Sequence, residues 1–290
     1  MIEKSELILN KDGSIFHLHL LPENIAGQVI LVGDQARVDT IAAFFEKIDF
    51  STQNREFKTV TGWYKNIRIT VLSTGIGTDN IDIVLNELDA LANIDFKKRE
   101  IKREKRSLNI IRIGTSGGLQ NDLPVNSFVV SQKSIGFDGL LPFYASWEKF
   151  CDIPFEKAFM EFVHWKRSLP TPYVVDASEQ LIARFGKEEF IKGATISAPG
   201  FYGPQGRILR LQLAMPELNR IIERFSFGGL KITNFEMESS AIYGLSRMLG
   251  HQALTVCLII ANRVNHQANE NYQPMMKKLI KKVLDSLTAE

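Results

Sequence analysis

Two glutamates flank a methionine at residues 234–240, which read Asn-Phe-Glu-Met-Glu-Ser-Ser and precede a helix-patterned run. Carboxylates are costly to bury among apolar residues unless they accept hydrogen bonds. Adjacent hydroxyls of a sugar ring can donate such bonds, and a charge-assisted bond is about twice as strong as a neutral one. Glu236 and Glu238 therefore indicate a polyol site. The same segment also fits a helix N-terminus, where the helix dipole favours acidic side chains and Ser or Asn caps the first turn.

Three arginines lie next to expected strand ends, namely Arg37, Arg55 and Arg112. Each one singly fits a surface or salt-bridge residue. Arg112 lies inside an apolar run, where an unpaired guanidinium is costly, so we expect its charge to pair with a ligand rather than with the protein. Arginines, glycine N–H groups and the hydroxyl of Thr115 meeting in one pocket would form a phosphate site. No Gly-x-Gly-x-x-Gly or Gly-Lys-Ser/Thr motif supports a dinucleotide or nucleoside triphosphate site.

A turn-rich segment at residues 201–207 carries an aromatic ring, an amide and a guanidinium. Phe201 can stack on a planar base, and Gln205 can pair with the donor and acceptor edges of that base. Arg207 can reach an exocyclic oxygen. Taken alone, the segment also fits an exposed loop.

Short β-rich runs alternate with helical patterns along the chain. Strands are expected at residues 29–32, 67–72, 108–113, 128–130 and 254–260, and helices after Gly33, at about 79–91 and at 272–287. This alternation predicts one α/β domain over residues 1–290, with helices on both faces of the sheet. Ligands in such sheets bind beyond the carboxyl ends of the strands. Gly33, Gly75 and Gly114 stand at such ends, and residues 114–118 are expected to close their strand as a loop.

A basic segment interrupts this alternation: seven of the ten residues from Lys97 to Arg106 are basic. A run this dense can contact nucleic acid. It has no interleaved aromatic residues, however, and Glu100 and Glu104 stand at helical spacing from basic neighbours. We therefore interpret the segment as a solvated connection, inserted near residues 94–107.

Composition excludes several classes of protein. The chain has 290 residues, of which 44% are hydrophobic and 23% charged, as in ordinary globular proteins. The near balance of 35 basic and 33 acidic residues creates no general attraction to nucleic acid or membranes. Cys151 and Cys257 form no disulfide or zinc motif. With no signal peptide and no run of about 20 apolar residues, we expect a cytoplasmic protein.

Six motifs occur in order, at residues 33–37, 54–57, 73–77, 112–117, 201–207 and 235–239. Together they resemble the nucleoside phosphorylase family of trimeric or hexameric enzymes, and within it the uridine phosphorylases. The match runs from Ile15 to the C-terminus. The resemblance implies a central mixed, partly barrel-like β-sheet flanked by helices.

The resemblance also assigns roles to residues. Phosphate binding is implied for Gly33, Arg37, Arg112 and Thr115, and for Arg55, which would serve the neighbouring subunit's pocket. Ribose binding is implied for Glu236, Met237 and Glu238, and for His17, which would reach across a dimer; His19 is a weaker rival for this role. Base recognition is implied for Ser116, Gly117, Phe201, Gln205 and Arg207. Arg112, Glu238 and Arg207 would act in catalysis.

Two details favour a pyrimidine enzyme. Purine-specific relatives usually carry a Ser-Asp pair after the final buried strand, whereas this chain has Ala261 and Asn262 there. Gln205 and Arg207 resemble the pair that reads uracil. The implied activity is reversible phosphorolysis of uridine to uracil and ribose 1-phosphate in pyrimidine nucleoside salvage. Inorganic phosphate is the co-substrate, and no cofactor is implied.

The chain also departs from the family pattern. Gln35 replaces the proline usual in the Gly-Asp-Pro turn, and Asn80 stands where some relatives have a Ser near an interface monovalent cation, beside Glu56 and Ile76. The alternatives left open are a purine phosphorylase, a nucleosidase using water, an inactive nucleoside sensor, and a nucleic-acid-binding protein acting through residues 97–106. Also left open are dimer versus hexamer, and the preference among uridine, 2′-deoxyuridine and thymidine.

Overall fold

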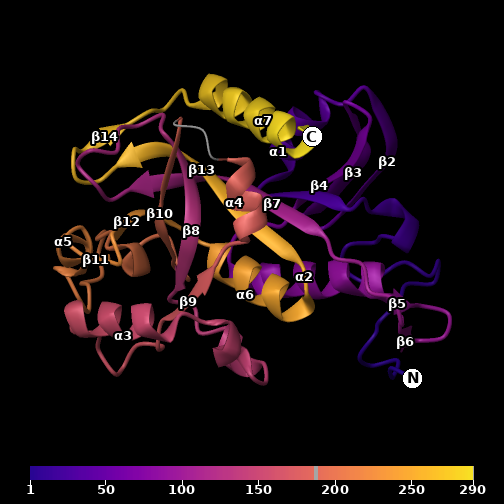
Figure 1. The fold of residues 1–290 in the computed structure, drawn as a ribbon, viewed down its shortest axis with the longest axis horizontal. Coiled ribbons are helices and arrows are strands. Elements are labelled where there is room, and N and C mark those ends of the chain that lie inside the picture. Colours follow the sequence, from indigo (N-terminus) through magenta and orange to yellow (C-terminus); the bar gives the residue numbers. More distant parts are fainter. Residues whose placement is uncertain (186–188, 290) are drawn as a thin grey trace.

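Strands and helices alternate along the chain in the computed structural model, which describes residues 1–185 and 189–289 (Figure 1). The strands are β1 (Gln28–Val32), β2 (Lys47–Asn54), β3 (Phe57–Tyr64), β4 (Ile67–Ser73), β5 (Ile94–Asp95), β6 (Glu100–Ile101), β7 (Asn109–Gly118), β8 (Phe128–Gly136), β9 (Tyr173–Asp176), β10 (Phe190–Ser197), β11 (Ser226–Phe227), β12 (Leu230–Glu236), β13 (Gln252–Asn262) and β14 (Gln267–Ala268). The α-helices are α1 (Gln35–Ala42), α2 (Thr78–Asn93), α3 (Ile153–Phe162), α4 (Glu179–Arg184), α5 (Leu218–Ile222), α6 (Ser239–Leu249) and α7 (Gln273–Thr288). The predicted α/β class is confirmed.

Most of the strands join one mixed sheet that partly closes on itself. Among the described residues this sheet has twelve strands, in the order β11-β12-β10-β8-β13-β7-β1-β4-β3-β2, with β9 added to β8 and β14 to β13. β12 also pairs antiparallel with β7, through Asn234 with Gly118 and Phe235 with Gly117. The strands β7, β13, β8, β10 and β12 therefore form a closed ring. This ring is the partly barrel-like sheet that the sequence predicts.

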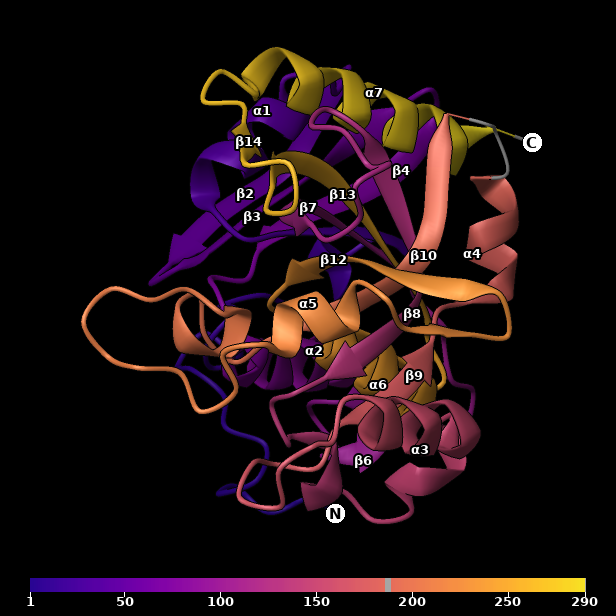
Figure 2. The same cartoon turned by 90° about the vertical axis from the view of Figure 1, so that its left-hand side faces the viewer.

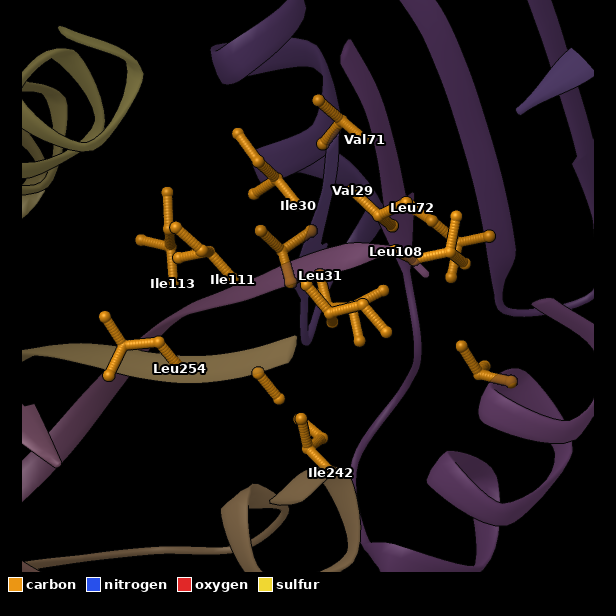
Figure 3. Packing of buried hydrophobic residues seen from close by; sticks show 14 of the residues in the cluster. Val29, Ile30, Leu31, Val71, Leu72, Leu108, Ile111, Ile113, Ile242 and Leu254 are labelled. Carbon is orange, nitrogen blue, oxygen red and sulfur yellow. The ribbon is translucent and has the colours of Figure 1, made fainter. Parts of the chain in front are cut away.

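The centre of the sheet is buried on both faces. α1 and α7 cover one face, and α2 and α6 cover the other (Figures 1 and 2). Figure 3 shows Val29, Ile30 and Leu31 of β1 among apolar side chains from the neighbouring strands and Ile242 of α6. Because parallel strands between two helical layers need apolar residues on both faces, β1 and the start of β7 read as continuous apolar runs.

Other strands are longer or less apolar than expected. β2 is an edge strand with mostly exposed side chains, so it lacks an apolar signal. β8 continues beyond Val130 through polar residues whose side chains are paired: Ser131 Oγ lies 2.5 Å from Thr195 Oγ1, and Ser134 Oγ lies 2.7 Å from Ser239 Oγ. Hydrogen bonding between these hydroxyls makes their burial tolerable.

The expectation that residues 114–118 form a loop is wrong, because β7 continues through Gly118. The glycines permit this path. A Cβ at Gly114 would lie 2.0 Å from Nη1 of Arg112, and one at Gly118 would lie 3.2 Å from Nδ2 of Asn262. Glycine therefore leaves room for the Arg112 guanidinium beside the strand and for close pairing of β7.

The basic segment at 97–106 contains the turn and the second strand of the β5–β6 hairpin at the right edge of Figure 1 and continues beyond the hairpin to Arg106. The helical spacing expected for Glu100 and Glu104 is therefore wrong. The expected solvent exposure is confirmed for most of its basic residues. Arg99 differs, because its side chain donates to the carbonyl oxygens of Ile2 and Glu3 and so fixes the N-terminal segment. None of the helices in residues 1–185 and 189–289 has the length and apolar character needed to cross a membrane.

Candidate active site

A cavity of about 330 Å³ opens at the carboxyl ends of β1, β7 and β12 and beside the end of β13. We call it the strand-end cavity. Its wall brings together the predicted site residues Gly33, Arg37, Arg112, Thr115, Ser116, Gly117, Phe201, Gln205, Arg207, Glu236, Met237 and Glu238. These residues come from four separate parts of the chain, so the fold alone makes them neighbours.

The centre of the strand-end cavity is a buried charge cluster. The Arg112 guanidinium donates to Oε2 of Glu238, and its Nη1 lies 3.4 Å from Oε2 of Glu236. The three residues are only 6%, 2% and 3% exposed, respectively. The expectation that Arg112 pairs with a ligand rather than with protein is therefore wrong. A buried arginine needs a permanent counter-charge, and two carboxylates from the end of β12 supply it.

The two carboxylates are held differently. Glu236 accepts hydrogen bonds from the backbone N–H groups of Glu238 (2.9 Å) and Ser239 (3.0 Å) and from the Ser239 hydroxyl, at the start of α6. It thus acts as the helix N-terminal acceptor considered above for this segment. Within residues 1–185 and 189–289, the Glu238 carboxylate accepts hydrogen bonds from Arg112 and from the backbone N–H of Gly77 at 2.9 Å. Glu238 therefore keeps more acceptor capacity for a ligand than Glu236 does.

Burial and charge shift the titration of this cluster in a consistent way. Burial raises the pKa of Glu238, and the neighbouring Glu236 raises it further, against the opposing effects of Arg112 and the Gly77 N–H. Burial opposes the charge of Arg112, but the two glutamates more than offset this and raise its pKa. Arg112 also keeps Nε and Nη1 buried without a hydrogen-bond partner among the described residues. Although Nη1 lies within ion-pair distance of Glu236, both atoms keep hydrogen-bond donor capacity that an acceptor on a ligand could use.

A second arginine, Arg37, lines the same cavity. Arg37 is on α1, where its Nη2 lies 3.0 Å from Oδ2 of Asp34 and its Nη1 donates to the Ile113 carbonyl at 3.4 Å. The N-terminus of α1 follows Gly33 directly, so backbone N–H groups and two guanidinium groups adjoin one part of the cavity wall. Such a combination suits a phosphate group.

Another part of the cavity wall carries the amide of Gln205, which accepts hydrogen bonds from two arginines. Gln205 is buried, with 4% of its surface exposed. Its Oε1 atom accepts hydrogen bonds from Arg207 at 2.7 Å and from Arg263 at 3.0 Å. The Arg207 guanidinium also lies 3.5 Å above the ring of Phe201. Because both donors hold Oε1, the orientation of the amide is fixed and its NH₂ group remains for a ligand.

Arg263 is a site residue that the sequence reasoning missed. Its guanidinium donates to the carbonyl oxygen of Gln205 as well as to the side chain, and it lies 5.2 Å from the ring of Phe235 in the cavity wall. Burial, together with the charge of Arg207, lowers the pKa of Arg263 to about 10. Arg263 follows the apolar run at 254–260 after Ala261 and Asn262, and a position next to an expected strand end is one of the signals that pointed to Arg112.

Ser116 and Gly117 line the cavity but are already engaged within the sheet. The Ser116 hydroxyl donates to the Phe235 carbonyl at 2.9 Å and accepts from Asn234 Nδ2 at 2.6 Å. Gly117 pairs with Phe235 across the β7–β12 contact. These residues shape the cavity wall, and the side chain of Ser116 has little capacity left for a ligand.

His17 and Arg55 do not line the strand-end cavity of their own chain, where Arg37 and Arg112 are the two predicted phosphate-binding arginines. The resemblance implies that both residues serve the neighbouring subunit's pocket, and that role stays a prediction. Within their own chain they lie near each other elsewhere. Arg55 is 5.9 Å from the ring centroid of Phe16, and Asn54 donates to the His17 carbonyl at 2.7 Å. The His17 Nδ1 atom lies 2.7 Å from Glu87 Oε1. His19 is apart from them and contacts Asp12.

The residues considered for a monovalent cation are neighbours in the structure. Asn80 Nδ2 lies 3.5 Å from the Ile76 carbonyl oxygen, and the Cγ atom of Glu56 adjoins Gly75. The Ile76 carbonyl thus faces an amide donor, which competes with a cation for that oxygen. In residues 1–185 and 189–289 no group of three or more His, Cys, Asp or Glu residues is arranged to hold a metal.

Comparison with known proteins identifies the class. The model of the phosphorylase superfamily matches residues 28–289, and this chain belongs to that family. The solved structure of a Trypanosoma brucei nucleoside phosphorylase, described as showing uridine phosphorylase activity, is 29% identical, with a TM-score of 0.88 over 98% of this chain and 100% of the other.

Curated relatives include both pyrimidine and purine enzymes. A uridine phosphorylase of Thermococcus kodakarensis is 28% identical over 92% of this chain and 85% of its own length. A guanosine phosphorylase of Halorubrum lacusprofundi is 27% identical over 85% of this chain and 83% of its own length. The choice of base therefore depends on the residues of the site.

Proposed function

We propose that this protein is a uridine phosphorylase, which converts uridine and inorganic phosphate reversibly to uracil and ribose 1-phosphate. The observation that carries the proposal is the division of the strand-end cavity. Arg37 and Arg112 supply guanidinium groups to its wall, Glu238 supplies a carboxylate bonded to Arg112, and Gln205 with Arg207 forms a separate polar group beside Phe201. These three parts match a phosphate, a ribose and a uracil in that order.

The mechanism follows from the charges that develop when the glycosidic bond breaks. The ribose becomes positive and the base becomes negative. Phosphate beside Arg37 and the unpaired donors of Arg112 stabilises the positive sugar and then attacks C1′. Glu238 accepts hydrogen bonds from the ribose hydroxyls and fixes the sugar, which lowers the entropy cost of reaching the transition state. The proposed chemistry uses phosphate and side chains only.

The base end favours uracil over a purine. Negative charge on the uracil oxygens needs donors, and Gln205 Nε2 and Arg207 are available in the cavity wall, while Arg263 holds Gln205 in place. A purine enzyme needs an acid near N7. In this chain Ala261 and Asn262 stand where purine-specific relatives usually carry the Ser-Asp pair. The Nδ2 atom of Asn262 donates to the carbonyl oxygens of Gln120 and Leu123. The Asn262 amide is therefore committed to the backbone and offers no proton to a purine.

A comparison of nucleosides tests the choice of base. Purified protein in phosphate buffer should cleave uridine with a kcat/KM far above that for inosine, because a site built for polar partners rejects analogues by about 10⁴–10⁵ in favourable cases. Gln205→Leu should reduce the uridine value selectively. Equal kcat/KM for inosine and uridine would refute the assignment.

We also propose that the active unit is a homodimer with shared sites. Arg55 and His17 lie outside the cavity of their own chain but adjoin one another on one surface. In a two-fold symmetric dimer, one such surface can complete the pocket of the other copy. Arg55 would then reach phosphate, and His17 would reach the ribose.

Mixing of inactive subunits tests the shared site. Arg55→Ala protein and Glu238→Ala protein should each be inactive, and their mixed dimers should contain one intact pocket. Random exchange should restore about a quarter of the wild-type activity, since half the dimers are mixed and each has one of two sites. Mass spectrometry should first demonstrate that the subunits have exchanged. If the mixed dimers then show no recovery of activity, each chain builds its site alone.

A further inference from the structure

A second cavity, of about 460 Å³, lies behind the turn that carries Gln205; we call it the rear cavity. The turn divides its residues between the two cavities. Phe201, Gln205 and Arg207 line the strand-end cavity, whereas Gly203, Pro204 and Gly206 line the rear cavity. A molecule bound in the rear cavity would therefore contact one side of the 201–207 turn, while the other side of the same turn is proposed to bind the base.

The rear cavity is mostly apolar. Trp165 and Phe137 form one side, with their ring centroids 4.7 Å apart, and Leu213 and Met215 line it from the loop that extends to the left of Figure 2. Large apolar and aromatic surfaces around a volume of this size are typical of small-molecule sites.

The one carboxylate in this wall is already satisfied. Asp138 accepts from the Leu140 N–H at 2.9 Å, from the Tyr173 hydroxyl at 2.8 Å and from the Ser240 hydroxyl at 2.8 Å. The Trp165 Nε1–H donates to the Pro170 carbonyl at 3.1 Å. Because the Asp138 carboxylate and the Trp165 N–H already have hydrogen-bond partners, neither needs a charged partner, and the cavity favours a neutral ligand.

Asn219 connects the rear cavity to base recognition. Its Nδ2 donates to the Gln205 carbonyl oxygen at 3.1 Å, which fixes the orientation of the amide. Its Oδ1 takes part in no hydrogen bond recorded for the described residues. A Cβ at Gly206 would lie 2.4 Å from Asn219 Nδ2, so the turn and the amide are in close contact. A donor reaching Oδ1 would hold Asn219 and, through it, Gln205.

We infer that the rear cavity binds a neutral aromatic molecule carrying one N–H or O–H donor, and that its binding strengthens nucleoside binding. The ring would pack between Trp165 and Pro204, and its donor would bond to Oδ1 of Asn219. The bound ring would then restrict the motion of Pro204 from the side of the rear cavity. Gln205 would consequently populate the conformation that binds the base to a greater extent. This second effect rests on the proposed uridine phosphorylase function.

Binding is tested first without substrate, using 5-fluoroindole as the probe and following its ¹⁹F NMR line width. Wild-type protein should broaden the line saturably. Ala214→Trp, which fills the rear cavity from its wall, should weaken binding at least about tenfold, as expected when a ligand loses its pocket. Leu211→Trp is the matched control, because Leu211 is 82% exposed on the same loop and does not line the cavity. Absence of binding to wild type, or equal binding by all three proteins, overturns the inference.

Kinetics test the link to base recognition. Saturating 5-fluoroindole should lower KM for uridine about fivefold, a typical coupling between sites, and leave KM for phosphate unchanged. Asn219→Leu should remove this effect while the fold persists. A competitive rise in KM for uridine would place the probe in the strand-end cavity and overturn the inference. Because the NMR measurement needs no turnover, loss of probe binding in an active enzyme contradicts this inference alone, whereas an inactive protein contradicts the proposed function.

Discussion

Replacing Arg112 by alanine should damage stability as well as activity, because this arginine neutralises two buried carboxylates. In Arg112→Ala, Glu236 and Glu238 would remain 3% and 2% exposed with no counter-charge between them. Removing one partner of a buried ion pair costs about 3–5 kcal/mol. At about 2–3 °C per kcal/mol for a chain of this size, the melting temperature should fall by about 6–15 °C.

The size of this loss should depend on pH in a defined direction. Burial and Glu236 already raise the pKa of Glu238, and removal of Arg112 would raise it further. A carboxyl whose pKa is higher in the folded state contributes stability below its unfolded pKa and loses it as pH rises through the folded value. The difference in melting temperature between wild type and Arg112→Ala should therefore be larger at pH 8 than at pH 5.

Differential scanning fluorimetry across this pH range measures the effect, and Arg37→Ala is the matched control. Arg37 also lines the cavity and is proposed to bind phosphate, but its partner Asp34 is 49% exposed. Such a pair contributes about 0–1 kcal/mol. Adding Glu238→Gln to Arg112→Ala should restore part of the lost stability. Equal, small and pH-independent shifts for Arg112→Ala and Arg37→Ala would refute the reasoning.

Three further predictions concern the proposed reaction. Because burial raises the pKa of Glu238, kcat/KM for uridine should fall with decreasing pH at values above the ordinary glutamate range, and Glu238→Gln should abolish this limb of the profile. Arg263→Met should raise KM for uridine about tenfold by removing charged donors from Gln205, with KM for phosphate unchanged; a parallel rise in both constants contradicts this role. Gln35→Ala should raise KM for phosphate severalfold, since Gln35 Nε2 holds the Arg55 carbonyl at 2.8 Å; an unchanged value would show that the Arg55 turn needs no such support.

The elements buried on both faces could be predicted from the sequence. β1 and the start of β7 are continuous apolar runs between helical layers, so their positions follow from composition alone. The ordered motifs also placed most of the candidate site residues correctly around one cavity. Their order along the chain carries this information because each motif follows a particular strand of the sheet.

Pairing between distant residues could not be predicted. Arg112 and Glu238 are 126 positions apart, and the contact depends on the closure of β12 onto β7. That closure in turn requires glycines at the end of β7, which local patterns indicate as a loop. Arg55 is a different case, because the resemblance assigns it to the neighbouring subunit's pocket, and within its own chain it lies outside the strand-end cavity.

The dependence of uridine cleavage on phosphate tests the central claim most directly. Purified protein is incubated with uridine in phosphate-free buffer and in phosphate buffer, and uracil and the sugar product are measured. We predict uracil release only with phosphate, together with an equal amount of ribose 1-phosphate, because Arg37 and Arg112 are arranged for an anion beside the ribose site. Equal uracil release without phosphate, with free ribose as the product, would contradict the account and identify a hydrolase.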